Sequence, residues 1–511
     1  MKTDNIWDAI CVGSGITSLA FGAQVVAKDP HAKILVLEKH SVAGGYATLF
    51  TRPRRAQAYF DCSMHKISGS RTDGGNFRRL FENLDLGKEL DMVEHPDHFQ
   101  TCLPEKQFSL PNDHKKVKEI LLAHFPDEEA GLEQYFDELL IHGKDAYYHY
   151  QIMTGSYDVD IKNLRFAHRN LKDITVAEAL DARFKDGMLK EILAAATIYV
   201  GGFAEDMSYL YYLHVVYATL CQGNAYIKGS AQQLSDVLVA RINNSGGQVK
   251  TKAEVLRITK LEDALFKVET KKEAFFARKV YVNAAPHHAL NKLFDSAPEL
   301  EAAKERLSVL KPARSTTTLY LVTKQPPQTL GVESSESMIF SHTQEQCMAA
   351  RSALNETSPE QDYENAFWHT GPMEVTNYHT LNPDGGNVLC VNVLDSVEHW
   401  PDRKDPDYKG KKQRAMSVMM ARLLKAKPAL EGHIVHAELA TPRTYYRYTY
   451  NEQGSGYGAV VQTKNSAHNF HHFFPYKNVK FLSAWASGSG YEAAFVYAEM
   501  MAQKWQSAPQ N

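Results

Sequence analysis

Short hydrophobic runs, separated by glycine-rich turns, mark the start of the chain. Residues 8–13, DAICVG, predict a buried strand, and the run LAFGAQVVAK that follows predicts a helix. A second apolar run, KILVLEK, ends at Glu38 and predicts another buried strand. Strand, glycine turn, helix and strand in this order are typical of one half of a nucleotide-binding α/β domain.

Other patterns follow further along the chain. Residues 247–259 alternate between apolar and polar positions, and FKVET and KVYVNAA come next, so we expect strands there. Near the end, VKFLSAW predicts a buried strand and GYEAAFVYAEMMAQKW predicts a helix. Residues 76–215 are rich in helix formers and aromatic residues and hold few strand-like runs. Within them, residues 208–221 are apolar nearly all round a helix, which is typical of core packing.

The order of these elements predicts an α/β fold with a Rossmann-type domain built from three separated segments. We expect this nucleotide-binding domain at residues 1–75, 220–295 and 435–511. Residues 76–219 and 296–434 would then form an inserted, mixed α+β domain that binds the substrate. A chain of 511 residues is long enough to bury two separate cores.

Charge and cysteine usage narrow the class of protein. The net charge is −3 at pH 7, so the basic excess typical of a nucleic-acid-binding protein is missing, and we expect no nucleic-acid partner. The six cysteines show no CxxC spacing, which argues against a zinc site or a disulfide framework and favours a reducing compartment. Without a secretory signal or a long apolar run, we expect a cytoplasmic protein that could rest on a membrane surface. The oligomeric state is not indicated.

The first glycine turn has the GxGxxG pattern, with serine in the last position. Gly13 permits a tight turn, Gly15 lets backbone come close to a pyrophosphate, and a small residue at Ser18 suits helix–strand packing. The helix that begins here offers free N–H groups and a positive dipole end to phosphates. We therefore expect a dinucleotide to be bound by Gly13, Ser14, Gly15, Ile16 and Ser18.

The second strand supports this interpretation. Glu38 lies 25 residues after Gly13, where a carboxylate can accept both ribose hydroxyls and would repel a 2′-phosphate. The stretch that follows carries paired glycines, which let the chain pass close to an extended ligand. Its candidate cofactor-binding residues are Lys39, Gly44, Gly45 and Tyr46.

Several later stretches resemble the motifs of one family in the same order. They are AYFDCSMHKISG (58–69), AYIKGSAQQLSDVLVARINNSGGQVKTKAEVLRI (225–258), KVYVNAAPHHAL (279–290), TPRTYYRYTYNEQGSGYG (441–458) and VKFLSAWASGSGYEAA (479–494). Together with the N-terminal motif they resemble the phytoene desaturase, carotenoid isomerase and retinol saturase group within the amine oxidase-type flavoproteins. Two positions depart from the pattern, since Cys62-Ser63 replaces a small-glycine pair and Ser230 stands where glycine is usual.

The resemblance implies FAD as the cofactor, held by the Rossmann-type domain. In the last motif, glycines allow backbone to approach a flat ring, and a helix starting near Tyr491 would point its dipole at the flavin, worth about 0.3–2 kcal/mol. No cysteine lies in this loop, so we expect a non-covalent cofactor. The resemblance further assigns Val255 to the adenine, and the last motif adds Trp485, Gly490 and Tyr491 as cofactor-binding residues.

Candidate catalytic residues come from the segments that the resemblance places near the flavin. His65 is a candidate acid, against the alternative of a histidine bonded to backbone in a turn. Tyr446 is a second candidate, against the alternative of aromatic lining. We predict no metal site, because His468, His471 and His472 have no nearby carboxylate or cysteine, and we expect a loop at the substrate entrance there.

The sequence therefore predicts an FAD-dependent oxidoreductase that desaturates, saturates or isomerises C–C or C=C bonds. The resemblance implies a hydrophobic substrate of the polyene or isoprenoid class. Only one dinucleotide fingerprint is present, so we expect electrons to pass to or from oxygen, a quinone or a carrier protein. Two alternatives stay open at this point: an amine oxidase-like enzyme acting on a small secondary metabolite, and a non-catalytic prenyl-protein carrier of the same architecture.

Overall fold

The computed structural model describes residues 6–53, 56–153, 170–262, 265–356, 367–463 and 474–505. One seven-stranded sheet is built from three distant parts of the chain, as the sequence predicts. Its main path runs in the order β10 (Gln248–Lys250), β2 (Ile34–Leu37), β1 (Ile6–Val12), β13 (Ala274–Val282), β12 (Phe266–Thr270) and β11 (Val255–Lys260). A last strand, β19 (Val479–Phe481), pairs in parallel with the carboxyl end of β13. The expected Rossmann-type α/β fold is confirmed.

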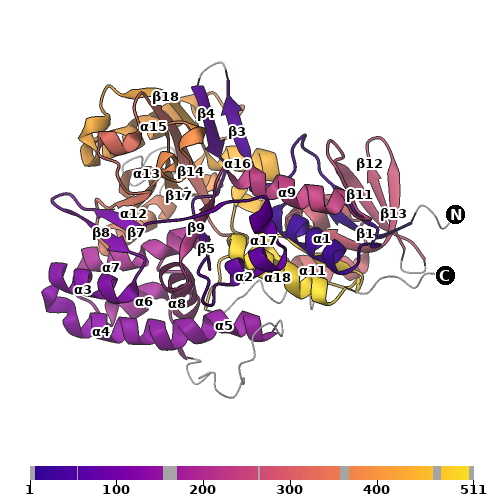
Figure 1. Ribbon diagram of the computed structural model, residues 1–511, viewed down its shortest axis with the longest axis horizontal. Coiled ribbons are helices and arrows are strands. Elements are labelled where there is room, and N and C mark those ends of the chain that lie inside the picture. Colours follow the sequence, from indigo (N-terminus) through magenta and orange to yellow (C-terminus); the bar gives the residue numbers. More distant parts are fainter. Residues whose placement is uncertain are drawn as a thin grey trace.

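Helices cover both faces of this first sheet and close its core. They include α1 (Ile16–Lys28), α2 (Asn76–Asn83), α9 (Ala231–Asn243), α11 (Pro298–Ser308) and α18 (Tyr491–Gln503). Figure 1 shows this half of the molecule on the right, with both ends of the chain beside it. The apolar runs that predicted β1 and β2 are fully buried here, which explains why they are continuous rather than alternating.

A second sheet of seven strands forms the other half. Its order is β18 (Ile434–Ala440), β14 (Ser315–Thr323), β17 (Val388–Asp395), β16 (Met373–Asn377), β15 (Glu336–Ile339), β7 (Asp97–Cys102) and β8 (Gln107–Pro111). All neighbours are antiparallel except β15 and β7. The expectation of few strands in 76–215 missed β7 and β8, whose many polar residues hide the alternation.

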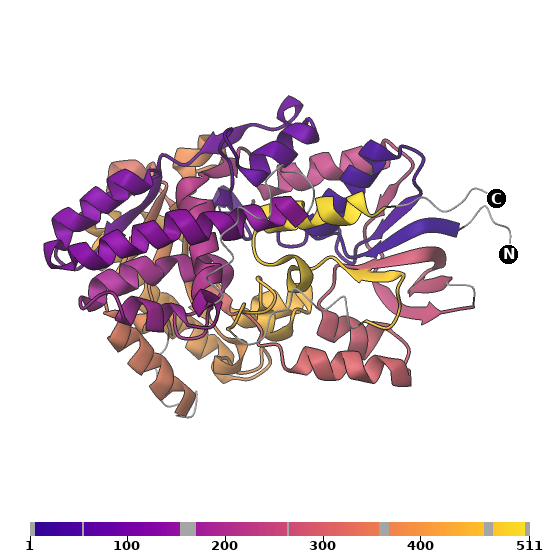
Figure 2. The same ribbon diagram turned by 90° about the horizontal axis from the view of Figure 1, so that it is seen from below.

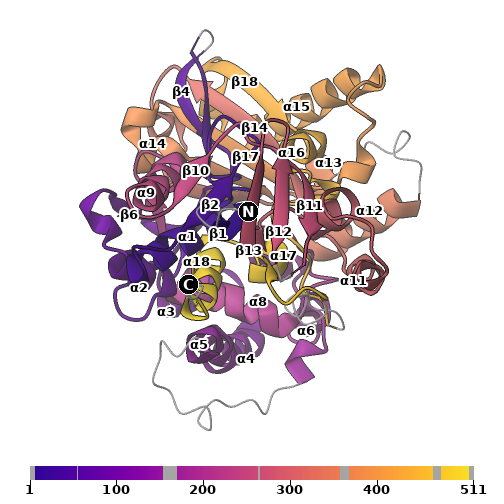
Figure 3. The same ribbon diagram turned by 90° about the vertical axis from the view of Figure 1, so that its right-hand side faces the viewer.

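Helices pack around the second sheet in two groups. One group comes from the middle of the first half of the chain and comprises α3 (His114–His124), α4 (Glu129–Glu138), α5 (Lys144–Met153), α6 (Val176–Asp181), α7 (Gly187–Ala194) and α8 (Tyr209–Val216). The other comprises α12 (Gln344–Glu356), α13 (Phe367–Thr370), α14 (Tyr378–Leu381), α15 (Asp407–Ala426) and α16 (Pro442–Thr449). Figure 2 looks onto the first group, and Figure 3 shows it at the opposite end from β4 (Ala56–Asp61) and β18.

Small elements connect the two halves. A hairpin of β3 (Leu49–Arg52) and β4 reaches from the first half, and Arg52 forms a salt bridge with Glu438 on β18 at 2.6 Å. A three-stranded sheet joins β5 (Ile67–Ser68), β9 (Asn224–Ile227) and β6 (Met92–Glu94). The helix expected at residues 208–221 is present as α8 and a π-helical turn, η8 (Tyr217–Cys221), and most of its side chains are buried.

Packing indicates domain limits that differ from those expected from the sequence. Helices α2 and α11 belong to the core of the first sheet, although they fall in the ranges 76–219 and 296–434. Strand β18 belongs to the second sheet, although it lies almost wholly beyond residue 434. We therefore propose that the chain crosses between the two domains somewhat later than residues 75, 295 and 435. Among the described residues, every helix is too short or too polar to span a lipid bilayer.

Candidate active site

A cradle of bare backbone lies where β1 ends. Gly13 has a φ of +96°, a conformation that L side chains rarely adopt, and Gly15 and Gly44 form a parallel bridge. A Cβ added to Gly15 would lie 2.1 Å from Oδ1 of Asn283, and one added to Gly45 would lie 3.0 Å from the Cα of Gly15. Side chains other than hydrogen therefore do not fit, and the backbone is left open to a ligand.

The carboxylate of Glu38 is held rigidly at the edge of this cradle. Glu38 is buried and accepts hydrogen bonds from the amide and the hydroxyl of Ser14, at 3.0 and 2.6 Å, and from the amide of His40 at 2.8 Å. Next to it, the Nζ of Lys39 lies 3.4 Å from the centroid of the Tyr450 ring. A negative charge that is fixed beside a glycine turn suits the two hydroxyls of a ribose.

Backbone pairing brings Val255 close to the same point. The amide of Lys252 donates to the carbonyl of His40, and the amide of Ala253 donates to the carbonyl of Glu38. Val255 follows two residues later, nearly buried, as the first residue of β11. This position agrees with the expected place of an adenine, which stays a prediction.

Two helix N-termini in this region carry no side-chain cap. Gly15 is the N-cap of α1 and Gly490 is the N-cap of α18, and in neither helix does the N-cap residue form a side-chain capping hydrogen bond. The two helices pack against each other, and Nε2 of Gln24 on α1 donates to the carbonyl of Phe495 on α18 at 3.4 Å. Free N–H groups and the positive ends of two dipoles are thus available to anionic groups.

The C-terminal motif differs from the expected continuous strand. Strand β19 ends at Phe481, and the short helix α17 (Ala484–Ser487) follows, so Trp485 lies on a helical turn. Trp485 is 1% exposed, its ring lies 4.7 Å from that of His287, and its Nε1 has no hydrogen-bond partner among the described residues. A buried donor without a partner is costly, so this nitrogen fits a cofactor that accepts from it.

A second line of bare backbone lies against α17. A Cβ on Gly458 would lie 2.5 Å from the carbonyl oxygen of Ala484, and Gly488 and Gly490 have φ values of +83° and +92°. The motif at 441–458 and the motif at 479–494 therefore meet at their glycines. Together with Trp485, these residues fit a large planar group, which is how the chain can hold a flavin ring.

Ser63 joins three of the sequence motifs. Its hydroxyl donates to the carbonyl of Tyr46 at 2.9 Å and lies 3.1 Å from Oη of Tyr491. The Oη of Tyr46 donates to the carbonyl of Ser455 at 3.1 Å, and burial raises the pKa of Tyr46 to about 12, so it remains a donor. The departure from the usual small-glycine pair thus supplies a hydrogen bond between the N-terminal and C-terminal motifs.

His65 points into the face of the second sheet. Its Nδ1 lies 2.8 Å from Oη of Tyr378, and its Nε2 lies 2.9 Å from Nδ2 of Asn392. Because Tyr378 donates to the carbonyl of Met64 at 2.8 Å, it accepts from Nδ1–H, and Nε2 accepts from the amide of Asn392. Burial lowers the pKa of His65 to about 4, so the ring is neutral at physiological pH. The alternative of a ring bonded to backbone in a turn is wrong.

The two adjacent tyrosines of the 441–458 motif lie in different environments. The side chain of Tyr446 is 43% exposed, whereas Oη of Tyr445 lies 2.7 Å from Oγ1 of Thr318 on the second sheet. Tyr445 also packs its ring 6.1 Å from the ring of Tyr46. The geometry therefore brings Tyr445, rather than the expected Tyr446, to the candidate site.

Sequence reasoning missed the charged residues beside His65. The Nζ of Lys66 forms an ion pair with Glu336 at 2.8 Å, and both side chains are almost completely buried. Glu374 lies on the neighbouring strand, and its Oε2 accepts from Nδ2 of Asn392 at 3.1 Å. A glutamate inside each of the strand-like runs ESMI and MEVTN was the sequence pattern that could have indicated them.

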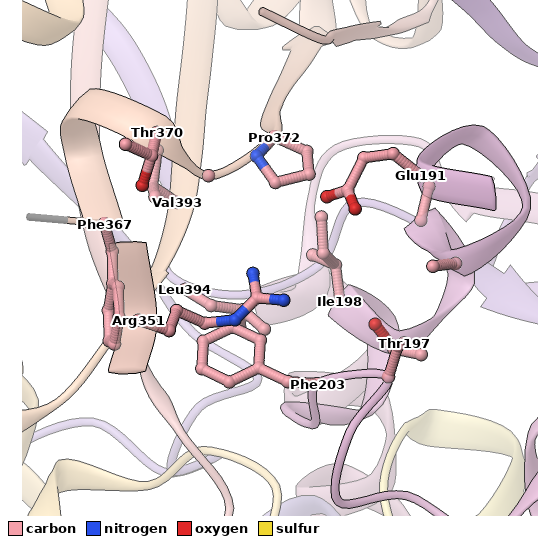
Figure 4. Close-up of a pocket in the computed structure, with 14 residues that line it drawn as sticks. Glu191, Thr197, Ile198, Phe203, Arg351, Phe367, Thr370, Pro372, Val393 and Leu394 are labelled. Carbon is pink, nitrogen blue, oxygen red and sulfur yellow. The ribbon is translucent and has the colours of Figure 1, made fainter. Parts of the chain in front are cut away.

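A cavity lies away from these residues, between α7 and the end of β17. Apolar side chains form most of its wall, and Figure 4 shows Glu191 and Arg351 both extending towards it. Arg351 donates to both carboxylate oxygens of Glu205, at 2.6 and 3.1 Å, and burial raises the pKa of Glu191 to about 7. His468, His471 and His472 lie outside the described residues.

Comparisons with known proteins agree with this geometry. A family model described as an NAD(P)-binding Rossmann-like domain matches residues 11–84, a range that includes α2. A prolycopene isomerase of Daucus carota is 24% identical over 487 residues, which are 89% of this chain and 72% of that protein. An all-trans-retinol 13,14-reductase of Rattus norvegicus is 23% identical over 485 residues, covering 88% of this chain and 77% of that protein.

Solved structures show the same fold. The cyclohexylamine oxidase of Brevibacterium oxydans matches with a TM-score of 0.62 and 16% identity, over 98% of both chains. An oxidoreductase of Methanosarcina mazei matches with a TM-score of 0.61 and 12% identity, over 97% of this chain and all of that one. These likenesses concern the fold alone. The Rossmann-like match indicates a nucleotide-type cofactor, and the similarity to the isomerase and the reductase indicates an oxidoreductase. Over nearly nine-tenths of its length, the chain is therefore similar to prolycopene isomerases and to all-trans-retinol 13,14-reductases.

Proposed function

We propose that the protein is an FAD-dependent oxidoreductase that saturates, desaturates or isomerises C–C or C=C bonds of a hydrophobic polyene or isoprenoid substrate. The observation that carries this proposal is the likeness, over nearly nine-tenths of the chain, to two kinds of enzyme named for polyenes, a prolycopene isomerase and a retinol reductase. Likeness to amine oxidases concerns the fold alone, so we do not propose amine oxidation. A non-catalytic prenyl-protein carrier is not supported by these relatives either.

The cofactor's place follows from the cradle. Glu38 would accept the ribose hydroxyls of the adenosine, the uncapped start of α1 would bind the pyrophosphate, and the backbone at Val255 would lie against the adenine. Other cofactor contacts are proposed for Gly13, Ser14, Gly15, Ile16, Ser18, Lys39, Gly44, Gly45 and Tyr46. When bound, FAD supplies hydride or electron transfer.

The flavin end would lie at α17 and α18. Trp485 would donate its unpartnered Nε1 to the ring system, and the start of α18 at Gly490 and Tyr491 would stabilise negative charge on it. The loop from 484 to 491 has no cysteine, so we propose that FAD is held without a covalent bond. His65 would act as a positioning residue for the second-sheet side chains rather than as an acid, because both ring nitrogens are engaged.

The substrate would be apolar and would exchange electrons with the flavin in a buried site. We propose oxygen, a quinone or a carrier protein as the electron partner, since a second dinucleotide fingerprint is missing from the sequence. Cytoplasmic location, with contact to a membrane surface from which a lipophilic substrate could enter, remains part of this proposal.

Two measurements on the purified protein test the proposal. The visible spectrum should show flavin absorbance, and all of the flavin should leave the protein after acid denaturation. The reduced and the oxidised holoprotein are then incubated with prolycopene and with all-trans-retinol without oxygen, and the products are separated by chromatography. A colourless protein that takes up no added FAD, or a holoprotein that is bleached by primary amines and converts neither polyene, would contradict the proposal.

A further inference from the structure

We infer that Lys66, Glu336 and Glu374 form a buried proton store for the reaction, and that Glu374 exchanges this proton with the substrate. The inference deepens the proposed function and rests on it, because it assigns the proton that addition to or removal from a C=C bond requires. It starts from three ionisable side chains, which we call the carboxyl cluster: Glu336 and Glu374 on the inner face of the second sheet, and Lys66, which contacts Glu336.

The cluster holds more carboxyl groups than cations. Glu336 lies on β15 and Glu374 lies on the neighbouring strand β16, and their exposed fractions are 0% and 3%. The Nζ of Lys66 forms an ion pair with Glu336 at 2.8 Å. One ammonium can neutralise one carboxylate, and a second buried negative charge without a partner would cost several kcal/mol. Glu336 and Glu374 therefore carry one proton in total, on one or the other carboxyl group.

The hydrogen-bond donors around the two glutamates are unequal. Oε1 of Glu336 accepts from Lys66 and from the hydroxyl of Tyr199, whereas the donor to Glu374 is a neutral amide, that of Asn392 at 3.1 Å. One oxygen of each carboxyl group, Oε2 of Glu336 and Oε1 of Glu374, has no hydrogen-bond partner among the described residues. A carboxylate needs hydrogen-bond donors at both oxygens, whereas a neutral carboxyl group needs fewer, so an oxygen without a donor favours the protonated form.

Within the part of the chain that the structure describes, the other titratable groups around the cluster do not supply a second cation. Those that face it from neighbouring elements are His65, His95, His98, Asp97, Tyr199 and Tyr457. Burial lowers the pKa values of the three histidines, so they are neutral, and Asp97 would only add negative charge. Burial raises the pKa of Glu336 to about 7 and also raises that of Glu374.

A chain of hydrogen bonds joins Glu374 to the candidate site. Thr318 donates to Oδ1 of Asn392 at 2.8 Å and accepts from Tyr445, and the amide nitrogen of Asn392 donates to both Glu374 and His65. The neutral His65 thus fixes the orientation of the amide, which fixes the carboxyl group. Because this orientation is set by side chains from both domains, the acid is held where the domains meet.

The chemical step balances as follows in the direction of saturation. When bound, reduced FAD would supply the hydride for one carbon of the C=C bond and would itself be oxidised, and the carboxylic acid of Glu374 would supply the proton for the other carbon. The double bond would become a single bond, and Glu374 would be left as a carboxylate near Lys66. Desaturation is the reverse, and isomerisation needs the proton to be added and then removed.

Infrared spectra of the holoprotein test for the shared proton without any substrate. The C=O stretch of a protonated, buried carboxyl group shifts in D2O, and we expect one such band to be missing from both Glu374→Gln and Glu336→Gln at neutral pH. Each variant leaves one carboxylate for one ammonium, so neither needs the proton. Glu119→Gln, on the exposed face of α3, is the control and should keep every band. Unchanged bands in both cluster variants would overturn the inference.

Turnover tests the second part. With all-trans-retinol and dithionite-reduced holoprotein in D2O, the wild type should place one solvent deuterium on the product. Its rate should fall as pH rises and Glu374, whose pKa burial raises, loses its proton. Glu374→Gln should be slower by about 10²–10⁴-fold, with unchanged flavin absorbance and unchanged reduction by dithionite. Polyene conversion at the wild-type rate by Glu374→Gln would overturn the inference and leave the proposed function standing. If the wild type converts no polyene, the proposed function falls and takes the catalytic step with it.

Discussion

The two sheets of this protein shape their parts of the site by different means. The first sheet ends in turns where glycines leave the backbone bare, so that the ligand would meet main-chain N–H groups and helix ends. The second sheet presents side chains, and its inner face carries Thr318, Glu336, Glu374 and Asn392, all buried. The first region would therefore bind the cofactor, and the second would hold polar side chains in fixed positions beside the proposed substrate.

The difference shows what each region tolerates. A backbone cradle fails when atoms are added, because a new Cβ meets backbone or a fixed side chain within about van der Waals contact. A buried polar cluster fails when atoms are removed, because its partners lose their hydrogen bonds or counter-charges in a dry interior. Three of the following variants add to or remove from one region and leave the other intact, and the fourth, Glu191→Gln, changes the separate cavity between α7 and β17.

The largest effect is expected from Gly15→Val. Its Cβ would lie 2.1 Å from Oδ1 of Asn283, which is itself fixed by a hydrogen bond to the carbonyl of Leu482 at 2.9 Å. The cradle must open, so we expect an almost complete loss of the cofactor, with purified protein that carries less than about a tenth of the wild-type flavin. Gly87→Ala is the control, since its Cβ would make ordinary contact with Phe81. Full flavin content in Gly15→Val would contradict the cradle.

Lys66→Met should give the next largest effect, on folding rather than on cofactor content. The variant leaves Glu336, which is 0% exposed, without its counter-charge, and breaking a buried pair costs about 3–5 kcal/mol. Urea unfolding at pH 8 measures the loss, which should shrink as pH falls and Glu336 takes up a proton. Stability equal to that of the wild type at pH 8 would show that the ion pair is not buried as described.

Glu191→Gln should change the pH dependence of stability. Burial holds the pKa of Glu191 at about 7 in the folded chain, above its ordinary value of about 4.5, so the folded state binds the proton more tightly. Its contribution is complete below about pH 4.5 and is lost as pH rises through about 7, by up to about 3 kcal/mol. The variant should therefore show a flatter decline in the free energy of unfolding between these pH values. An unchanged slope would mean that Glu191 is solvated.

The smallest effect is expected from Tyr445→Phe. It removes the hydroxyl that bonds Thr318 at 2.7 Å and should cost about 1 kcal/mol of unfolding free energy. The neighbouring Tyr446→Phe is a matched control and should change stability by less than about 0.5 kcal/mol, because its side chain is 43% exposed. Equal losses of unfolding free energy in the two variants would contradict the conclusion that Tyr445, and not Tyr446, contacts the second sheet.

The sequence predicted the first region better than the second for a physical reason. A glycine turn before a helix is local in the chain, so the pattern of neighbouring residues is enough to assign Gly13, Gly15 and Gly44. The carboxyl cluster joins residues 66, 336 and 374, and a pattern read along the chain does not show which distant strands become neighbours. Tyr445 and Tyr446 show the same limit, since adjacent residues on one helix point about 100° apart and only packing decides which one turns inward.

The packing of α1 against α18 has a consequence for the newly synthesised chain. The hydrogen-bond partner of Gln24, Phe495, is synthesised 471 residues later. At about 5–20 residues per second, the ribosome needs roughly 20–100 s to reach it. During that time the side of α1 that packs against α18 stays uncovered, although α9 can already cover part of α1 next to Ile242. Because the proposed cofactor site includes the start of α18, uptake of the cofactor would follow translation of that helix.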